Sequence, residues 1–220
     1  MPSSTVENYL KELYTMQRKY DGELVPLGKL AETVGVTAGT ATIMVKRLAK
    51  NGLVIYEARS GTKLTEDGQR KALSVLRRHR LIELFLVEVV KLDWSEVHEE
   101  AEILEHAISD RLLSRIDDML GNPTHDPHGD PIPAATGEMI ERRLISLADA
   151  HPGEVTIARI ADHAPAFLQF IHEKGLTPDA TIQVMNRNDI AETISLLVND
   201  QPLQLGTSAA EKIMVLDQSF

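Results

Sequence analysis

The 220-residue sequence contains no cysteine, so disulfide bonds and thiolate metal ligands are excluded. This absence fits a cytoplasmic protein, and we expect the chain to be one. No apolar run approaches the roughly 20 residues that a membrane-spanning helix requires. The first residues show no basic region followed by an apolar core, so we expect no signal peptide. What the chain does contain, 43% hydrophobic and 25% charged residues, is typical of a globular protein.

The charge is distributed unevenly along the chain. The formal net charge is −10, yet residues 1–80 carry +6, whereas residues 81–150 carry −11 and residues 151–220 carry −5. A basic segment in an acidic chain indicates an anionic partner, most often nucleic acid. We therefore expect a nucleic-acid interface in the N-terminal third of the chain and not in the rest.

The N-terminal third has the pattern of a winged helix-turn-helix. Apolar residues at helical spacing predict helices over residues 6–16, 27–34 and 38–51, and Thr37 can cap the third of them. The extended run L-V-I-Y-E, followed by a Gly-containing turn and a second extended piece, predicts a β-hairpin wing. This arrangement is typical of DNA-binding domains, and the alternative is a small helical domain that binds no DNA.

The third helix is the expected recognition helix. Its first turn has small and hydroxylated side chains and no Arg, Asn or Gln, so we expect few bidentate base contacts and more specificity from DNA shape and apolar contact. Ile43 can touch a thymine methyl group, and the basic residues are candidates for phosphate contacts. The full set expected to contact DNA is Thr37, Gly39, Thr40, Thr42, Ile43, Lys46, Arg47, Arg59 and Lys63.

A second pattern, V-H-E-E-A-E-I-L-E-H, occupies residues 97–106. As a helix it has an apolar face and a face of imidazoles and carboxylates. The apolar face holds Ala101, Ile103, Leu104, Ala107 and Ile108, and the polar face holds His98, Glu102, Glu105 and His106. One interpretation is an ordinary solvated acidic face. The other is a divalent-metal site, which is favoured because His79 and Glu83 lie one helical turn apart in the preceding helix.

The helix that carries His79 is expected to lie at a subunit interface. Residues 69–93 form one predicted helix that becomes heavily apolar from Leu81 onward, with more apolar surface than one packed face needs. We therefore expect a homodimer, which also suits a palindromic DNA site. A further single helix is predicted from Trp94 to about Arg115, with Ser95 as its cap.

The last part of the chain changes character. Residues 121–137 contain four prolines and three glycines and are predicted to form a loop, which a metal could hold through its His and Asp side chains. Residues 138–149 are predicted to form a short helix. Strands are expected at residues 155–160, 181–186, 193–198, 201–205 and 212–216, with a helix at residues 165–174. Short strands with one helix predict a small β-barrel.

Three motifs follow one another in the chain: R-H-R-L-x-E, V-H-E-E-A-E-x-L-E-H and H-D-P-H-G-D-P-I-P. Together they resemble the diphtheria-toxin-repressor family (DtxR) of metal-dependent transcriptional regulators, and its manganese branch (MntR) more than its iron branch. The resemblance covers nearly the whole chain and implies a mainly α fold with small β parts. The implied domains are a winged helix-turn-helix at residues 1–72, a helical metal-binding and dimerisation domain at residues 73–149 that includes the loop 121–137, and an SH3-like (FeoA-type) β-barrel at residues 150–220.

The resemblance also implies two metal sites in each subunit. The primary site corresponds to Asn8, His79, Glu102, Glu105 and His106. The second site corresponds to Glu83, Asp126, His128 and Asp162, with His98 and His163 as further candidates. Glu102 matches the manganese branch, whereas Asn8 stands where that branch usually has an Asp, and Lys11 where some members carry a Glu. Because every candidate ligand is an oxygen or an imidazole nitrogen, we expect Mn²⁺, or alternatively Fe²⁺.

The predicted function is that of a DNA-binding repressor and not of an enzyme. Mn²⁺ or Fe²⁺ is expected to fix the homodimer for operator binding and thereby to repress genes of divalent-metal uptake. One alternative is a DNA-binding regulator that senses a non-metal ligand. The other is a metallohydrolase, which the lack of a nucleophile motif and of a Gly-rich phosphate-binding loop argues against.

Overall fold

The computed structural model describes residues 4–20 and 23–217, which belong to two compact units. The first unit contains the chain up to His79 together with Glu105–Ile108 and Pro133–Glu138, and the second contains Arg80–Leu104, Ser109–Ile132 and the chain from Met139 onward. Each unit has its own core of buried apolar side chains. Within the described ranges, no helix is both long enough and apolar enough to cross a membrane.

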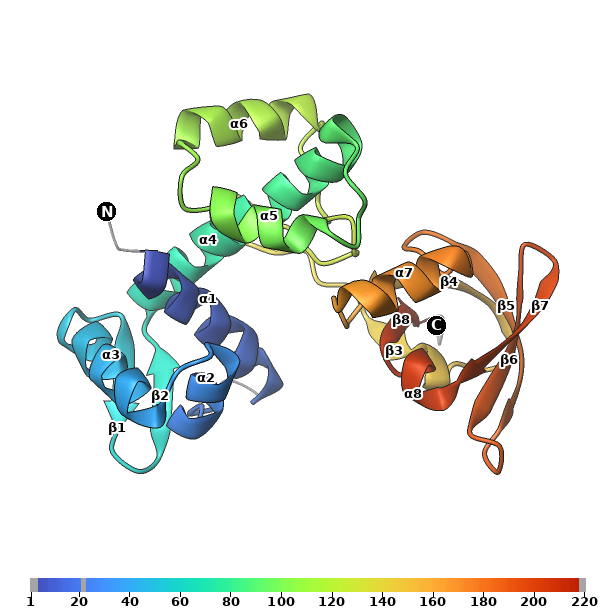
Figure 1. Cartoon of the computed structure of the whole chain (residues 1–220), viewed down its shortest axis with the longest axis horizontal. Coiled ribbons are helices and arrows are strands. Elements are labelled where there is room, and N and C mark those ends of the chain that lie inside the picture. Colours follow the sequence, from blue (N-terminus) through green and yellow to red (C-terminus); the bar gives the residue numbers. More distant parts are fainter. Residues whose placement is uncertain (1–3, 21–22, 218–220) are drawn as a thin grey trace. The chain divides into compact units, whose positions relative to one another are not determined.

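The first unit begins with the predicted winged helix-turn-helix (Figure 1). Its elements are α1 (Ser4–Lys19), α2 (Leu27–Thr33), α3 (Ala38–Lys50), β1 (Val54–Glu57), β2 (Gly61–Leu64) and the first part of α4 (Glu66–Phe85). α3 starts where the sequence predicts, because the Thr37 hydroxyl accepts a hydrogen bond from the Thr40 amide and caps the helix. The predicted inner face of α3, formed by Ala41, Val45 and Leu48, is buried in the core of this unit.

The wing is the predicted hairpin, in which β1 and β2 pair in antiparallel fashion. Thr62 of β2 also exchanges two backbone hydrogen bonds with Val25, which ties the segment before α2 to the wing. Gly61 is required at this point, because its φ is +150° and a Cβ atom would lie 2.5 Å from the Val25 carbonyl oxygen. Arg59 lies at the exposed tip in the left-handed conformation, with a φ of 71°.

Two helices replace the single helix expected from Trp94 to Arg115. They are α5 (Val97–Leu104) and α6 (Asp110–Met119). The prediction is wrong because Ser109 is extended and its hydroxyl accepts a hydrogen bond from the Leu112 amide, which starts a new helix. Ser95 does not cap a helix at Trp94, since its amide and hydroxyl both donate to Asp93 and the helix begins only at Val97.

The helix before them is also less regular than predicted. α4 passes into a π-helical segment, η1 (Leu86–Val90), and the chain then turns at Lys91 with a left-handed φ of 67°. Only part of the predicted apolar run of this helix is buried. Leu81 and Ile82 are buried, whereas Val89 and Val90 are 46% and 48% exposed. The exposed apolar surface is therefore at the end of the predicted helix and not along all of it.

Residues 138–149 do not form the helix that their pattern predicts. An extended stretch leads into β3 (Leu144–Ser146) and a short 3-10 helix, η2 (Leu147–Asp149). β3 pairs in antiparallel fashion with β8 (Ile213–Leu216), near the end of the described chain. The prediction is wrong because this pairing is non-local, so it overrides the helical spacing of the apolar residues. The sheet thus begins inside the range that was expected to be helical.

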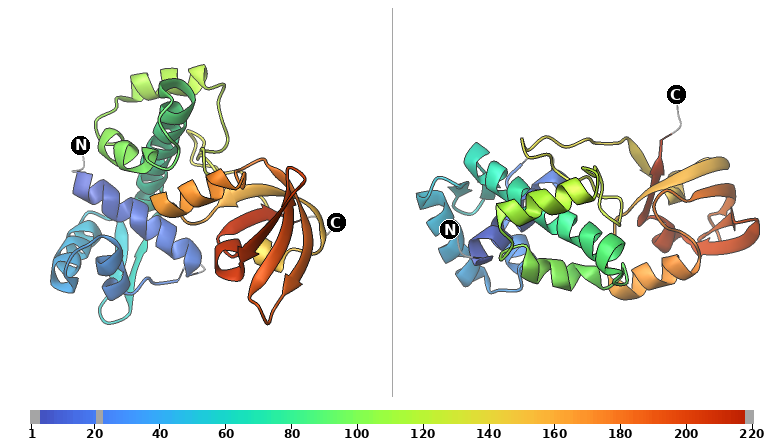
Figure 2. Two further views of the ribbon diagram at one scale, coloured as in Figure 1. Left: turned by 45° about the vertical axis from the view of Figure 1, so that its right-hand side comes forward. Right: turned by 90° about the horizontal axis from the view of Figure 1, so that it is seen from above.

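The second unit contains a six-stranded sheet in the order β3-β8-β4-β5-β6-β7, in which each neighbouring pair is antiparallel. Its other elements are β4 (Gly153–Ile160), β5 (Thr181–Asn188), β6 (Thr193–Val198), β7 (Gln201–Gly206), α7 (Pro165–Glu173) and α8 (Thr207–Ala210). Register shifts after Ile157 and Val184 bend the strands, and the sheet curls (Figures 1 and 2). This SH3-like β domain confirms the predicted fold class.

A glycine in α4 tests how closely α4 packs on the wing. A Cβ atom on Gly68 would lie 1.9 Å from the Leu53 carbonyl oxygen, so Gly68→Ala must shift backbone. We expect it to lower the free energy of unfolding by about 1–3 kcal/mol, the usual effect of overpacking. The matched control is Gly28→Ala on α2, where a Cβ atom meets nothing within 4 Å and where helix propensity predicts a gain of roughly 0.5–1 kcal/mol. Urea unfolding followed by circular dichroism measures both, and equal stability of the two variants would contradict the packing.

Candidate metal centres

The first unit gathers charged side chains around one buried carboxylate, that of Glu105. Its Oε2 atom lies 2.6 Å from His79 Nδ1, and the Lys11 ammonium lies 2.8 Å and 2.9 Å from the two carboxylate oxygens. Glu105 is fully buried, and Lys11 and His79 are each only 5% exposed. Lys11 belongs to α1 and His79 to α4, so two helices and the short segment Glu105–Ile108 meet here. We call this group, together with Glu7, Asn8 and His106, the first cluster.

Glu105 is held in its ionised form. Burial raises the pKa of this carboxyl group, but the hydrogen bond with His79 and the positive charge of Lys11 outweigh burial, and the pKa lies below its ordinary value. A buried carboxylate with this environment is ready to bind a cation without first losing a proton.

His106 is oriented by Glu7, a residue that sequence analysis missed. Because a carboxylate accepts hydrogen bonds, His106 Nδ1 donates to Glu7 Oε2 over 2.6 Å, and this leaves Nε2 with its lone pair in the neutral ring. A carboxylate that fixes the far nitrogen of an imidazole is typical of metal-binding histidines. The signal that could have found Glu7 is its place on α1, directly before Asn8 and one turn before Lys11.

Two buried atoms of the first cluster have no hydrogen-bond partner among the described residues, namely Asn8 Oδ1 and His106 Nε2. His106 Nε2 lies 3.3 Å from Glu105 Oε1 without forming a hydrogen bond. An unpaired buried polar atom costs roughly 1–3 kcal/mol, so each requires another explanation. An amide oxygen, an imidazole nitrogen and a carboxylate are ligands of divalent metals. The residues present therefore fit a metal ion.

The predicted polar helix face is only partly observed. α5 ends at Leu104, so Glu105 and His106 lie in the turn that follows it. The predicted apolar face is buried only in part, because Ala101 is fully buried whereas Ile103 is 67% exposed and Leu104 is 39% exposed. Of the predicted primary set, the first unit brings together His79, Glu105 and His106, with Asn8 next to Glu7 on α1. Glu102 belongs to the second unit, where its carboxylate lies 3.8 Å from His98 Nε2, and its part in the primary site stays a prediction.

The second unit contains another buried group, which we call the second cluster. It consists of Glu83 on α4 and Asp126 and His128 in the Pro/Gly-rich loop, and their ligand atoms lie within 4.8 Å of one another. All three residues are buried. The sequence predicted each of them for the second site, and the structure places them side by side.

A tight turn presents the loop residues of the second cluster. Asp126 Oδ1 accepts hydrogen bonds from the amides of His128 and Asp130, at 2.9 Å and 3.0 Å. Gly129 has a φ of +84°, and a Cβ atom there would lie 2.0 Å from the Ala158 carbonyl oxygen of β4. The P-H-G-D sequence is therefore explained by backbone geometry, since a side chain at the glycine would push the turn away from the strand.

His128 keeps a free lone pair inside the second cluster. Its Nε2 donates to the Trp94 carbonyl oxygen over 2.9 Å, because a carbonyl can only accept. Burial lowers the pKa of His128 and so favours the neutral ring, in which Nδ1 carries no proton when Nε2 donates. Nδ1 is buried and has no hydrogen-bond partner within the described part of the chain. This nitrogen could therefore serve as a metal ligand, because the hydrogen bond of Nε2 fixes the orientation of the ring.

The carboxylates of the second cluster repel one another. Burial, and then the negative charges of Asp130 and Glu83, raise the pKa of Asp126 well above its ordinary value. Arg80 opposes this from 3.6 Å, on the other carboxylate oxygen of Asp126. A divalent cation would stabilise the ionised carboxylates in the same way, so these residues also fit a metal ion.

The remaining predicted residues of the second site divide into two groups. His98 Nδ1 lies 3.1 Å from Glu83 Oε1, and the His163 ring stacks on His128 with 4.6 Å between centroids. Asp162 is not part of this group in the structure, because its carboxylate accepts from Lys212 at 2.7 Å and from the Ala164 amide that starts α7.

Asp130 lies beside His163, a predicted residue of the second site, and sequence analysis missed it. Its Oδ2 atom lies 3.2 Å from His163 Nε2, and its Oδ1 atom lies 3.3 Å from Arg80. The signal that could have found it is the turn itself, since Asp130 follows His128 and Gly129 directly and must lie on the same turn.

The predicted DNA-contact residues lie on the exposed side of α3 and on the wing. Ile43 is 73% exposed, and Thr37, Gly39, Thr40, Lys46, Arg47 and Arg59 are exposed, whereas Thr42 and Lys63 are half-buried. The hydroxyl of Thr42 donates to the Ala38 carbonyl, and the Thr37 and Thr40 hydroxyls bond to each other. Ile43 and the exposed basic side chains Lys46, Arg47 and Arg59 are therefore the groups most accessible to an external partner.

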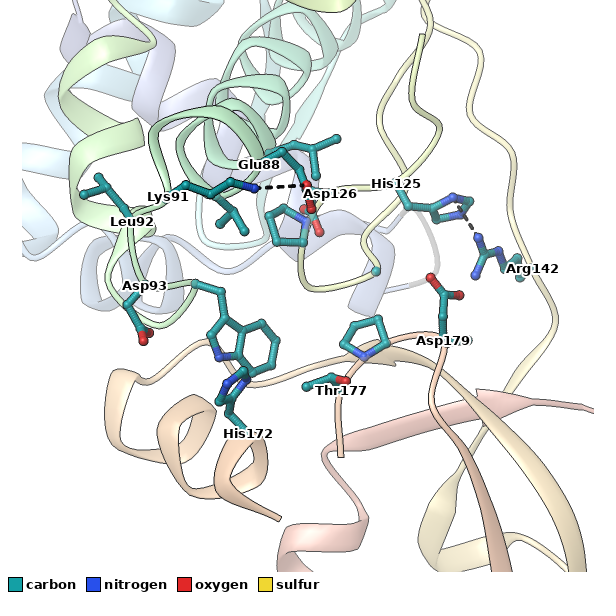
Figure 3. A pocket seen from close by; sticks show the side chains of 17 residues that line it. Glu88, Lys91, Leu92, Asp93, His125, Asp126, Arg142, His172, Thr177 and Asp179 are labelled. Atoms are coloured by element: carbon teal, nitrogen blue, oxygen red, sulfur yellow. Dashed lines mark hydrogen bonds and ion pairs between the residues drawn. The ribbon is translucent and has the colours of Figure 1, made fainter. Parts of the chain in front are cut away.

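A pocket in the second unit has one residue of the second cluster, Asp126, in its lining (Figure 3). Asp126 lines it together with Trp94, whose ring stacks on His128 on one side and lies 5.6 Å from the His172 ring on another. Figure 3 also shows the contact between His125 and Arg142, which are 2.8 Å apart.

Comparisons with known proteins decide the family. "Iron dependent repressor, N-terminal DNA binding domain" matches residues 1–62, "Iron dependent repressor, metal binding and dimerisation domain" matches residues 65–134, and "FeoA domain" matches residues 145–217. The iron-dependent repressor IdeR of Mycobacterium leprae is 31% identical over 196 residues, which are 82% of this chain and 83% of the relative. The chain belongs to the iron-dependent repressor family. The diphtheria toxin repressor of Corynebacterium diphtheriae is 27% identical over 227 residues, with 96% of each chain covered.

Solved structures of iron-dependent repressor relatives agree over almost the whole chain. A manganese-dependent transcriptional repressor in complex with manganese is 40% identical, with a TM-score of 0.86 and coverage of 96% of this chain and 99% of the other. The resemblance predicted from the three motifs is thereby confirmed, and the FeoA match confirms the SH3-like assignment of the last domain.

The pair of Asp130 and His163 predicts a pH dependence. Burial lowers the pKa of His163, but the hydrogen bond and charge of Asp130 outweigh it, and the pKa is raised. The stabilisation is therefore fully present below the unfolded-state pKa of about 6.5 and is lost as the pH rises through the folded-state pKa. In excess chelator, we expect Asp130→Asn to remove this loss of stability with rising pH, measured by urea unfolding at several pH values. Asp189→Asn, which faces the non-titrating Arg187, is the control, and identical pH profiles for all three proteins would contradict the prediction.

Proposed function

We propose that the chain is a DNA-binding transcriptional repressor that a divalent metal activates at the first cluster. As a member of the iron-dependent repressor family it is a metal-dependent regulator, and the first cluster supplies the physical link. The observation that carries the proposal is the pair of buried unbonded atoms, Asn8 Oδ1 and His106 Nε2. Asn8 lies on α1 of the DNA-binding head, and His106 lies in the Glu105–Ile108 segment.

Four side chains of the first unit would hold the metal: Asn8, His79, Glu105 and His106. When bound, the ion supplies positive charge that their lone pairs share. Glu7 keeps the His106 ring oriented, and the His79 ring is fixed by its contact with Glu105. Since no sulfur is present, we propose Mn²⁺ or Fe²⁺ as the physiological ion. The second cluster, with Glu83, Asp126 and His128, would hold a second ion in each subunit.

Residues on α1 couple this site to DNA binding. Glu7, Asn8 and Lys11 occupy neighbouring turns of the helix that packs into the head, and two of them contact the Glu105–Ile108 segment directly. A head held in this arrangement keeps α3 and the wing in one orientation. Because the ion binds this arrangement better than others, the population shifts toward it. We propose that the result is tighter operator binding and repression of divalent-metal uptake genes.

We also propose that the active form is a homodimer. The second unit exposes large apolar side chains that a monomer would leave in water, namely Val89, Val90, Ile103, Leu104, Leu112 and Met119. We propose that a second copy of the chain covers these side chains, because homodimer interfaces are more apolar than the rest of a protein surface. Two heads related by a twofold axis would then read the two halves of a palindromic operator.

Metal-dependent operator binding tests the central proposal. With an operator fragment selected from random duplex DNA, we expect Mn²⁺ or anaerobic Fe²⁺ to tighten binding by about 5- to 150-fold over chelated protein, the usual range of such coupling. His106→Ala should lose most of this effect, because it removes a nitrogen ligand, and exposed His151→Ala should keep it. Fluorescence anisotropy measures the affinities.

Two outcomes would contradict the proposal. Operator affinity that is unchanged by chelation and by Mn²⁺ would rule out metal control. A double variant, Glu105→Ala with His106→Ala, that keeps full regulation would show that the repressor senses a non-metal ligand instead.

The DNA interface makes a separate prediction. Arg47→Ala should weaken binding to all duplexes and reduce the slope of log affinity against log salt by about 1, as the loss of one phosphate contact does. Ile43→Ala should leave this salt slope unchanged and alter the preference among operator sequences, because an apolar contact carries no ionic term. Anisotropy titrations at several salt concentrations separate the two, and the same salt slope in both variants would contradict this division.

A further inference from the structure

A lysine lies among the residues that would hold the metal. Lys11 is 5% exposed, and its ammonium contacts both oxygens of Glu105, at 2.8 Å and 2.9 Å. A buried ammonium is unfavourable unless it is paired, so the carboxylate is what holds it there. Lys11 therefore uses the same two oxygens that a divalent cation needs at this position.

The charges of the first cluster are already balanced by residues of the chain. Glu105 is paired with Lys11, and Glu7 is paired with Arg78 at 3.7 Å. A divalent ion that enters this arrangement meets the ammonium at short range, and like charges in a partly dry site repel strongly. The Lys11 ammonium contacts the two oxygens of Glu105. The two buried atoms without a hydrogen-bond partner among the described residues, Asn8 Oδ1 and His106 Nε2, belong to other side chains. The lysine thus blocks one ligand while two others stay available.

We propose that Lys11 is a tethered cation that competes with divalent metal for Glu105 and so sets the metal concentration at which the protein responds. This proposal rests on the proposed function of the first cluster. Without metal, Lys11 keeps the buried carboxylate paired and α1 attached to the Glu105–Ile108 segment. When metal binds, Glu105 must either contact both the ion and Lys11 or lose its contact with Lys11. The free energy needed for this exchange makes the observed free energy of metal binding less favourable.

A merely structural ion pair would behave differently from a competitor. If Lys11 only stabilised the fold, its removal would lower the melting temperature by the same amount with and without metal. If Lys11 competes, its removal lowers the melting temperature in chelator but increases the stabilisation that Mn²⁺ provides, because the ion then takes over the charge on Glu105. The difference between these two melting-temperature shifts is the diagnostic quantity.

The experiment compares Lys11→Met, Lys11→Gln and Lys11→Arg with the parent chain. All carry His128→Gln, so that Mn²⁺ titration reports on the first cluster. Isothermal titration calorimetry gives the Mn²⁺ affinity and stoichiometry, and thermal melting is recorded in chelator and in saturating Mn²⁺. We expect the two neutral variants to bind Mn²⁺ roughly tenfold tighter or more, as removal of one close like charge predicts, and Lys11→Arg to resemble the parent. Lys11→Gln can still donate a hydrogen bond to Glu105 and serves if Lys11→Met does not fold.

Each result decides the proposal. Neutral variants that bind Mn²⁺ with the parent's affinity, or more weakly, would overturn competition and leave Lys11 as a structural partner of Glu105. A parent chain whose first cluster binds no Mn²⁺, with neutral variants that bind none either, would overturn the proposed function itself. His106→Ala in the same background separates these cases, because it must abolish binding at the first cluster whenever binding there occurs.

Discussion

The burial of the Glu105 carboxylate is the constraint on which the first unit depends. A charge removed from water requires partners, and here they come from α1 through Lys11 and from α4 through His79. α5 ends at Leu104, and the turn that follows contains the buried Glu105, whereas Ile103 is exposed. The DNA-binding head therefore contacts the proposed metal ligands Glu105 and His106 through ion pairs, in addition to the packing of its apolar core.

The second cluster differs from the first in how its buried carboxylates are stabilised. Its carboxylates repel each other, and the nearby cation, Arg80, is 3.6 Å from Asp126 and is also shared with Asp130. The loop residues are held by backbone bonds of the turn and by the fit of Gly129 against β4. A preformed site with excess negative charge gains more from a divalent ion than a site that carries its own ammonium. The two clusters are thus expected to differ in affinity although their ligand types are the same.

The sequence predicted the parts of the structure that local rules determine. The capped α3, the wing and the C-terminal strands follow from side-chain period, turn residues and Thr37, and they were predicted correctly. The failures are non-local: β3 was predicted as helix because its partner β8 is remote in sequence, and the break before α6 depends on the backbone of Ser109. For the sites, helical spacing indicated Glu83, and the motifs shared with the family indicated Asp126 and His128. They could not show that Asp130 faces His163, or that Glu7 orients His106, because both depend on contacts between segments.

The lack of sulfur ligands argues against metals that prefer thiolates, but ligand type does not by itself separate Mn²⁺ and Fe²⁺ from Zn²⁺ in this protein. Both clusters offer oxygen and imidazole nitrogen, and for such ligands the general order of affinity places Mn²⁺ and Fe²⁺ below Zn²⁺ and Cu²⁺. Discrimination must then arise from the geometry that the fold imposes and from the metal concentrations that the protein meets. A neutral amide at Asn8 and an ammonium at Lys11 both reduce the negative charge of the first cluster, so both weaken its attraction for any divalent ion. A sensor built this way responds at higher metal concentrations than one with carboxylates at the same two positions, and the fixed orientation of His106 and His79 decides which ion fits best.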